Sequence, residues 1–412
     1  MSSDRLYYTD AYLVEFDGVV RDVVKNGDRW IATLDRTAFY PTSGGQPFDT
    51  GTLSEAKVLE VLDREDGTIG HVIDRELDKN LRVRGYIDWF RRFDHMQQHT
   101  GQHLLSAAFE REGGARTVNF HLGTSSATID LDKEVSADQI GTAEAAANTV
   151  LWENREVSVK FVSAHEAAKL PLRKDPTRTG ELRIIEIKNY DLSACGGTHV
   201  DRTGAIGIIA VAGSERFKGG TRVEFVCGNR ALRAYRGLKD SVGGGVRLLS
   251  VLPEELPSAI EKLQAANRAQ QKSQEALLER FAVHEAAALA SRARKVGDVM
   301  LVAEALSGWD ANGLKRLASA VTSRPGIVAV LLTAESPVLI VLARSQDVAF
   351  DAGPVLKQLV ERFGGKGGGK GAMAQGGGLS GPSQEILTAA RDAILAAVEV
   401  LIRTSLRDQN PS

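Results

Sequence analysis

The sequence predicts an α+β multidomain chain with a small N-terminal β-barrel, a larger α+β domain, a helical linker and a C-terminal α/β domain. Three observations support this prediction. Short β-branched runs separated by turn-forming pairs fill the first 90 of the 412 residues. From residue 91 onward, helical and strand patterns mix. A stretch without Gly or Pro over residues 258–294 then separates this region from a last set of alternating elements.

Residues 1–90 are expected to form the barrel. The segments 13–20, 30–35 and 57–63 are rich in apolar and β-branched residues, as is typical of strands. Asn26-Gly27 and Asp66-Gly67 interrupt these runs, and such pairs favour the tight turns of β-hairpins. Between them, residues 39–46 (FYPTSGGQ) have the composition of a rigid turn.

Residues 91–250 are expected to form an α+β domain. Apolar residues recur with helical spacing over 93–111, and a second helix is predicted over 137–154. Strand-like segments occupy 127–131, 157–162, 182–187, 205–211 and 222–227, with a glycine-rich turn at 195–197.

Residues 251–295 are expected to form the helical linker, as either one long helix or a helical hairpin. Residues 296–412 are expected to form the C-terminal α/β domain. There, strands at 299–303, 327–333 and 338–343 alternate with helical stretches, and an apolar helix over 383–406 closes the chain.

Composition limits the class of protein. The 43% hydrophobic and 25% charged fractions are ordinary for a globular protein, and the apolar runs are too short to span a membrane. Residues 1–8 lack the order of a secretory signal, so we expect a cytoplasmic protein. The net charge of −2 argues against general attraction to nucleic acid but leaves room for a local basic patch.

Two residue pairs have the chemistry of metal ligands. His99 and His103 are spaced i, i+4 on the predicted helix, so their imidazoles project from one face. Cys195 and His199 flank Gly196-Gly197-Thr198, and glycines permit a tight turn that brings both side chains to one point. Three imidazoles and a thiolate suit a tetrahedral zinc ion. Each pair lacks partners alone, and together they complete one site.

Alternatives to this metal site remain at the level of the residues. Cys195 is otherwise a buried thiol and His199 a core histidine, and four protein ligands are also typical of a purely structural zinc. Cys227 has no partner motif and is expected in the core. His95, one helical turn before His99, and His121 are candidates for a general base or for a group that positions a ligand.

Several motifs together resemble a known family. They are FYPTSGGQ at 39–46, MQQHTGQHLLS at 96–106, FHLG at 120–123 with TIDL at 128–131, and CGGTHV at 195–200. With them the chain resembles the alanyl-tRNA editing family, related to the editing domain of alanyl-tRNA synthetase, in its long form with a C-terminal tRNA-binding domain. The run GGKGGGKGAMAQGGG at 364–378 resembles the synthetase's C-terminal domain, which DHH-type phosphoesterases share. The resemblance spans nearly the whole chain.

The resemblance implies the metal and the domains. His99, His103, Cys195 and His199 would be the ligands of one Zn²⁺ per chain, and the sequence shows no departure at these positions. Residues 1–90 would be a barrel of the translation-factor kind and residues 91–250 the zinc-binding editing domain. Residues 296–412 would bind tRNA, and a homodimer through this C-terminal domain is a further prediction, because the related domain can self-associate.

The implied activity is hydrolysis of the ester that joins a wrong amino acid to the terminal ribose of tRNA. The implied partner is alanine tRNA mischarged with serine or glycine, and no membrane is involved. A site that must hydrogen-bond a hydroxyl can reject alanine, because its polar groups would stay unpaired. Thr117 is the candidate that reads the serine hydroxyl; otherwise it is an ordinary β-branched strand residue.

Two glycine-rich segments are candidates for tRNA contact. Gly44, Gly45 and Gln46 either approach the 3′-terminal nucleotides or form only a sharp barrel corner. Lys366 and Lys370, with the exposed amides around them, either contact phosphates or lie in a flexible linker.

Three rival functions are weighed against the hydrolase. A full synthetase is disfavoured because the chain starts directly with the barrel. A DHH-type phosphoesterase is disfavoured because Asp94-His95 is followed by Met96, which leaves its metal motif incomplete. A non-catalytic tRNA-binding module with structural zinc would have no need of a pocket hydroxyl.

Overall fold

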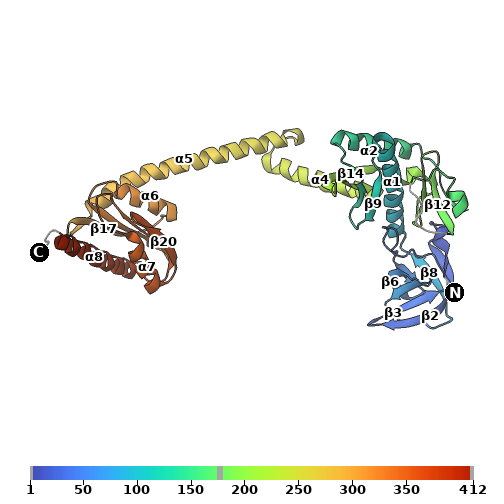
Figure 1. The fold of residues 1–412 in the computed structure, drawn as a ribbon, viewed down its shortest axis with the longest axis horizontal. Helices are drawn as coiled ribbons and strands as arrows, with labels where there is room; N and C mark the ends of the chain where they lie inside the picture. The colour runs from blue at the N-terminus through green and yellow to red at the C-terminus, as the bar shows by residue number, and fades with distance from the viewer. Residues whose placement is uncertain (1–2, 174–179, 409–412) are drawn as a thin grey trace. The chain divides into compact units, whose positions relative to one another are not determined.

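The computed structural model describes residues 3–173 and 180–408, and for 399–408 the backbone alone. It divides into two compact units, Met1–Leu248 and Leu249–Ser412, which are described separately (Figure 1). The chain is thus a mixed α+β protein of more than one unit, as predicted. The finer division at residues 90, 250 and 295 stays a prediction.

The first unit begins with a closed six-stranded barrel, which confirms the predicted barrel. In barrel order its strands are β2 Glu15–Asn26, β3 Arg29–Leu34, β7 Ile69–Ile73, β6 Ala56–Asp63, β5 Gly51–Leu53 and β8 Arg82–Ile87. Gly27 and Gly67 adopt positive φ in the turns that follow β2 and β6, as their Asn-Gly and Asp-Gly pairs favour. Alternate strand residues such as Val20, Leu34 and Val61 fill the interior.

The helix α1 (Trp89–Gly113) is the central element of the rest of this unit. Asp88 caps its N-terminus by accepting from the Arg91 amide, and Gly114 ends it in the left-handed conformation. One face of α1 packs on a four-stranded sheet. A Cβ on Gly101 would lie 2.3 Å from Cys227 Sγ, so only glycine permits this close approach.

Two sheets and a second helix complete the unit. The first sheet has the order β14-β15-β10-β9, with β14 Ile209–Phe217, β15 Gly220–Cys227, β10 Ala127–Leu131 and β9 Thr117–Leu122. The second contains β11 Val157–Ser163, β12 Glu181–Ile187 and β13 Asp191–Ala194. Helix α2 (Ala137–Trp152) starts in a Ser136/Gln139 capping box. The strand expected at 205–211 is corrected in its first half, because Thr203–Ile206 is a 3₁₀ turn.

The sequence does not predict α4 (Gly228–Leu249), the last helix of the first unit. In the second unit α5 (Leu256–Ser291) is one continuous helix of 36 residues, which decides against a helical hairpin. Its last turns are buried, since Ala282, Ala286 and Leu289 pack on α6 (Ala311–Val321).

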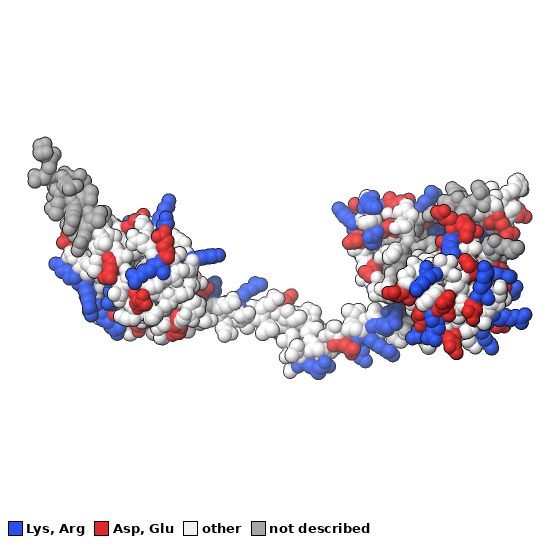
Figure 2. Space-filling model, turned by 90° about the horizontal axis from the view of Figure 1, so that it is seen from below, with Lys and Arg blue, Asp and Glu red and all other residues white. Residues whose placement is uncertain are grey.

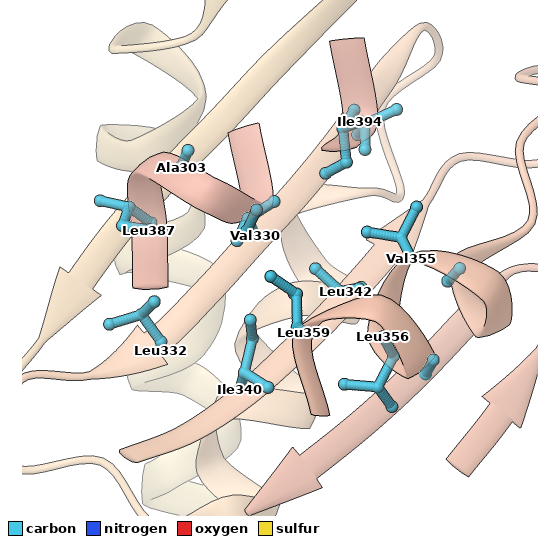
Figure 3. Close-up of a cluster of buried hydrophobic side chains, with 14 of the residues drawn as sticks. Ala303, Val330, Leu332, Ile340, Leu342, Val355, Leu356, Leu359, Leu387 and Ile394 are labelled. Atoms are coloured by element: carbon cyan, nitrogen blue, oxygen red, sulfur yellow. The ribbon is translucent and has the colours of Figure 1, made fainter. Parts of the chain in front are cut away.

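The second unit is a sheet with helices on both faces. Its six strands run in the order β16-β17-β18-β19-β21-β20. Their bounds are Arg294–Val296, Val299–Leu306, Ile327–Thr333, Val338–Arg344, Met373–Leu379 and Lys366–Lys370. Every residue of β18 is buried, with successive side chains on opposite faces. Val330 and Leu332 pack under α7 (Ala352–Phe363) and α8 (Ser383–Asp408), as Figure 3 shows, while Ala329 and Leu331 face α5 and α6.

Over the described residues, every helix is too short or too polar to cross a membrane. On the faces visible in Figure 2, basic and acidic side chains are interspersed over each unit, in keeping with the net charge of −2.

Candidate metal centre

Helix α1 supplies two of the predicted ligands from one face. His99 and His103 are both buried, and their ring centroids lie 5.4 Å apart. Phe120 of β9 stacks on the His99 ring with centroids 5.2 Å apart, which fixes the ring plane.

The other two ligands come from the loop after β13. Cys195 and His199 bracket Gly197, and a Cβ on Gly197 would lie 2.2 Å from His99 Cε1. The glycine is therefore required because the loop backbone lies directly against an imidazole, and its φ is not in the left-handed region. A tight turn alone, the reason given from the sequence, does not explain this position.

The four side chains meet at one point. Their ligand atoms all lie within 4.8 Å of one another, and Cys195 Sγ is 3.4 Å from Nε2 of both His99 and His199. Bond lengths of about 2.3 Å for Zn–S and 2.0–2.1 Å for Zn–N place S and N about 3.5 Å apart around a tetrahedral ion. The spacing of the donors fits such an ion.

Each histidine is held through Nδ1, which leaves Nε2 for the common point. The partner of His99 Nδ1 is Gln46 Oε1 at 2.8 Å, that of His103 is Asp191 Oδ2 at 2.8 Å, and that of His199 is Thr100 Oγ1 at 3.2 Å. Such partners fix the tautomer and the ring orientation of metal-binding histidines.

The electrostatics favour the metal-binding protonation state of Cys195 and His199, whereas His103 holds a proton at neutral pH. Burial opposes ionisation of Cys195, but the nearby histidines hold the pKa of its thiol well below its usual value. Burial, together with His99, lowers the pKa of His199 to about 3, so its imidazole is neutral. Burial likewise opposes the charge on His103, yet Asp191 and Cys195 raise the pKa of His103 to about 9. A bound cation would take the place of the proton on this ring.

Thr117 lies over the same face of α1. A bulge in β9 shifts the register, so that Thr117 and Phe120 both project toward the helix. Thr117 Oγ1 donates to Ser106 Oγ at 2.7 Å, and Ser106 follows His103 by three residues. The half-buried Thr117 hydroxyl therefore lies beside the cluster's helical face.

Two other sequence-predicted residues lie elsewhere. His121 is exposed and projects from the face of β9 opposite to Phe120, because adjacent strand residues alternate, so the expectation of a base is corrected. His95 is buried beside a cavity of about 660 Å³. Burial, with Arg91 and Arg230, lowers the pKa of His95 to about 3, which makes it a weak base at neutral pH.

The Gly44-Gly45 turn is a two-residue hairpin between Ser43 and Gln46, with both glycines at positive φ. Gly44 stays exposed, whereas Gly45 lies against β9, where a Cβ would meet Phe120 O at 2.8 Å. Gln46 is fully buried, so its expected tRNA contact is corrected: its amide holds His99 and Thr198.

The C-terminal glycine-rich run forms the β20–β21 hairpin at the sheet edge, which rules out a flexible linker there. A Cβ on Gly367 would lie 2.7 Å from Gln375 O, and a Cβ on Gly369 would lie 2.5 Å from Ala374 Cα. The close pairing of the two strands therefore requires glycine at both positions. Lys366 and Lys370 are exposed on the edge strand.

The sequence did not predict which residues hold the histidine ligands in place. Asp191 and Thr100 gave local hints, since Asp191 precedes Cys195 by four residues and Thr100 adjoins His99. Gln46 lies 53 residues from His99, so only the fold brings the two together.

Comparison with known proteins shows the family to which the chain belongs. A family model described as the "Threonyl and Alanyl tRNA synthetase second additional domain" matches residues 182–224, which include Cys195 and His199, and a "DHHA1 domain" model matches residues 298–402. The "Alanyl-tRNA editing protein AlaX-L" of Pyrococcus horikoshii is 31% identical over 96% of this chain and 100% of its own length. This chain belongs to the alanyl-tRNA editing protein family.

Larger proteins contain a region that is similar to nearly the whole of this alanyl-tRNA editing family member. The "Alanine--tRNA ligase" of Pyrococcus furiosus is 34% identical over 90% of the chain, which spans only 41% of that ligase. A solved C-Ala domain from Aquifex aeolicus alanyl-tRNA synthetase covers 24% of the chain and 96% of its own, with 22% identity and a TM-score of 0.23, too low to assign a fold.

Proposed function

We propose that this chain hydrolyses the ester between a wrong amino acid and the 3′ ribose of alanine tRNA, with serine as the main substrate and glycine as the second. The cluster of His99, His103, Cys195 and His199 is the observation that carries the proposal. Family membership supports it, because a relative matched over its full length is named an alanyl-tRNA editing protein.

One Zn²⁺ per chain is the proposed metal, since three imidazoles and a thiolate are its preferred donors. When bound, zinc supplies Lewis acidity, which polarises a carbonyl or acidifies water. Gln46, Asp191 and Thr100 would hold the three rings in place for it.

Thr117 is the proposed selector of serine. Its hydroxyl and that of Ser106 already form a bonded pair beside the ligand-bearing face of α1, and Gln102 donates to Ser106 at 2.8 Å. A serine hydroxyl can form a further hydrogen bond with this pair, whereas the methyl group of alanine cannot form one.

The decisive experiment measures first-order deacylation of Ser-tRNA and Ala-tRNA, both on alanine tRNA, with metal content assayed in parallel. We expect fast loss of serine, slow loss of alanine, and collapse of both activity and metal content in Cys195→Ala. Cys227→Ala is the control, because it removes the chain's other thiol, which packs against Gly101. Equal slow rates on both substrates with full metal content would leave a binding module with structural metal.

Thr117→Val tests the selector with the metal retained. We expect the ratio of serine to alanine hydrolysis to fall by at least about tenfold, since a lost hydrogen-bond partner removes discrimination. Thr128→Val on the neighbouring strand β10 is the matched control. An unchanged ratio in Thr117→Val would remove Thr117 from the proposal and leave the hydrolase intact.

The remaining parts of the proposal concern partners and location. Lys366 and Lys370 on the exposed edge strand suit contact with tRNA phosphates, and a homodimer would form through the C-terminal domain. Both cysteines are free, and a site that needs a thiolate suits the reducing cytoplasm. Among the side chains described for residues 3–173 and 180–398, the one cluster of potential metal ligands contains no carboxylate, which disfavours a phosphoesterase.

A further inference from the structure

The cavity beside His95 lies next to the metal centre and has no part in the hydrolysis proposed above. It has a volume of about 660 Å³ and lies between the start of α1, the start of α4 and the β9–β10 turn. His95 lines it, and one helical turn of about 5.4 Å separates His95 from the ligand His99. The cavity therefore adjoins the proposed reaction site.

Aromatic side chains form one part of the cavity wall. Trp89 and Phe93 pack on each other with ring centroids 5.2 Å apart. Phe90 between them in sequence is 89% exposed, although its ring borders the same cavity. An uncovered aromatic ring beside a cavity is a platform on which a nucleobase can stack.

The charges around the cavity are mainly positive. Arg230 is paired with Asp94 at 2.7 Å and also donates to Gly123 O. Arg233 is 61% exposed and reaches the same carboxylate only at 3.9 Å. Arg91 donates a hydrogen bond to the carbonyl oxygen of Phe48, and this uncharged acceptor does not neutralise its positive charge. Three guanidinium groups thus face one carboxylate, an arrangement that attracts a phosphate group.

One buried polar atom on the wall lacks a partner. His95 is only 3% exposed, and within the described residues no group hydrogen-bonds to its Nδ1. Buried polar atoms in folded proteins are nearly always bonded, so an unpaired one beside a cavity marks a place where a ligand can complete the site.

We propose that this cavity binds a nucleotide of a single-stranded RNA 3′ end, with its base on Phe90, its phosphate on Arg91 and Arg233, and a polar group on His95. This inference rests on the proposed function, because it assigns a subsite for the nucleotide part of the same substrate. It differs from that function in being a binding event that needs neither metal nor hydrolysis.

The test titrates the trinucleotide CCA, without an attached amino acid, into the full-length protein by calorimetry. AMP is a second probe. We expect saturable binding of CCA that is retained in Cys195→Ala. Phe90→Ala should weaken it about tenfold, the usual effect of losing one stacked base. Arg233→Ala should weaken it and reduce its salt dependence, since one phosphate contact is lost.

Matched controls keep this test specific. Trp152 is 68% exposed, and neither it nor Arg216 lines the cavity, so Trp152→Ala and Arg216→Ala should bind CCA like the unchanged protein. Both test residues are exposed, so folding should survive their loss. Equal CCA affinity in Phe90→Ala and the unchanged protein, or binding of AMP but not CCA, would overturn the inference.

Failure of this inference can be distinguished from failure of the proposed function. If Ser-tRNA is hydrolysed but Phe90→Ala leaves both KM and CCA binding unchanged, the nucleotide subsite is wrong and the hydrolase stands. If CCA binds through Phe90 and Ser-tRNA is not hydrolysed, the nucleotide site stands and the hydrolase is wrong. With both correct, Phe90→Ala should raise KM and leave kcat nearly unchanged.

Discussion

At the scale of single residues, the metal centre depends on Gly197 and not on the glycine before it. A Cβ on Gly197 would overlap the His99 ring at 2.2 Å, whereas a Cβ on Gly196 would meet its nearest neighbour, Tyr8 Oη, at an ordinary 3.6 Å. We expect Gly197→Ala to lower metal affinity at least about tenfold by displacing a ligand. Gly196→Ala should bind metal normally, and competition with a chelator measures both. Equal affinities would show that the loop adapts at no cost.

Gln46 was predicted to contact tRNA, but in the structure it holds a candidate ligand in place. Its Oε1 accepts from His99 Nδ1 at 2.8 Å and from the Thr198 amide at 3.1 Å, so it orients a ligand from the barrel side. Gln46→Leu should lower zinc affinity about 10–100-fold, as loss of such partners does. Gln97→Leu, which removes a buried amide bonded to Ala205 O, is the control and should keep its metal. A retained metal affinity in Gln46→Leu would make Gln46 only a packing residue.

At the scale of elements, Arg92 joins α1 to the barrel. Its guanidinium is fully buried, pairs with the equally buried Asp49 at 2.5 Å, and donates to the carbonyls of Ala11 and Ala38. Arg92→Met would leave the Asp49 charge uncompensated and should cost about 3–5 kcal/mol of unfolding free energy. Arg91→Met, one residue earlier, should cost less than about 1 kcal/mol. Denaturant unfolding measures both, and similar losses would contradict this role.

The barrel also carries a pH-sensitive element. His71 is fully buried between Thr37 and the Ala32 carbonyl, and burial lowers its pKa to about 4. In the unfolded chain His71 has an ordinary pKa of about 6.5. Between pH 6.5 and 4 the unfolded chain therefore binds a proton on His71 that the folded barrel does not bind. Stability should fall as pH drops from 6.5 toward 4, by up to about 3 kcal/mol from this group. His71→Gln should flatten that slope, whereas the exposed His165→Gln should leave it unchanged.

Elements with a strong local signal were predictable, and those without one were not. The strand at 327–333 was recognised because an apolar β-branched run is sufficient for a strand buried on both faces. Helix α4 was missed because it contains Gly243-Gly244-Gly245, which local preference places in a loop. The four ligands stand in two local motifs, but Gln46 acts only through a contact between barrel and helix. Sequence pattern cannot report such a distant pairing.

At the scale of the whole molecule, the two units should respond differently to metal. All four candidate ligands lie in Met1–Leu248, and the core of Leu249–Ser412 is built from its own sheet and helices. A ligand that binds only the folded state stabilises by about 2.7 kcal/mol at 100 times its Kd. For a unit of 248 residues this raises the midpoint by roughly 5–10 °C.

Calorimetric unfolding of the full-length protein should therefore show two transitions, of which a zinc chelator lowers only one. The shifted transition is assigned by Cys195→Ala, in which the chelator should have no effect because the cluster has lost a ligand. Val330→Ala in the second unit should lower the other transition alone, since it opens a cavity in a separate core. A single transition that moves as a whole in both variants would mean that the two units unfold as one cooperative body.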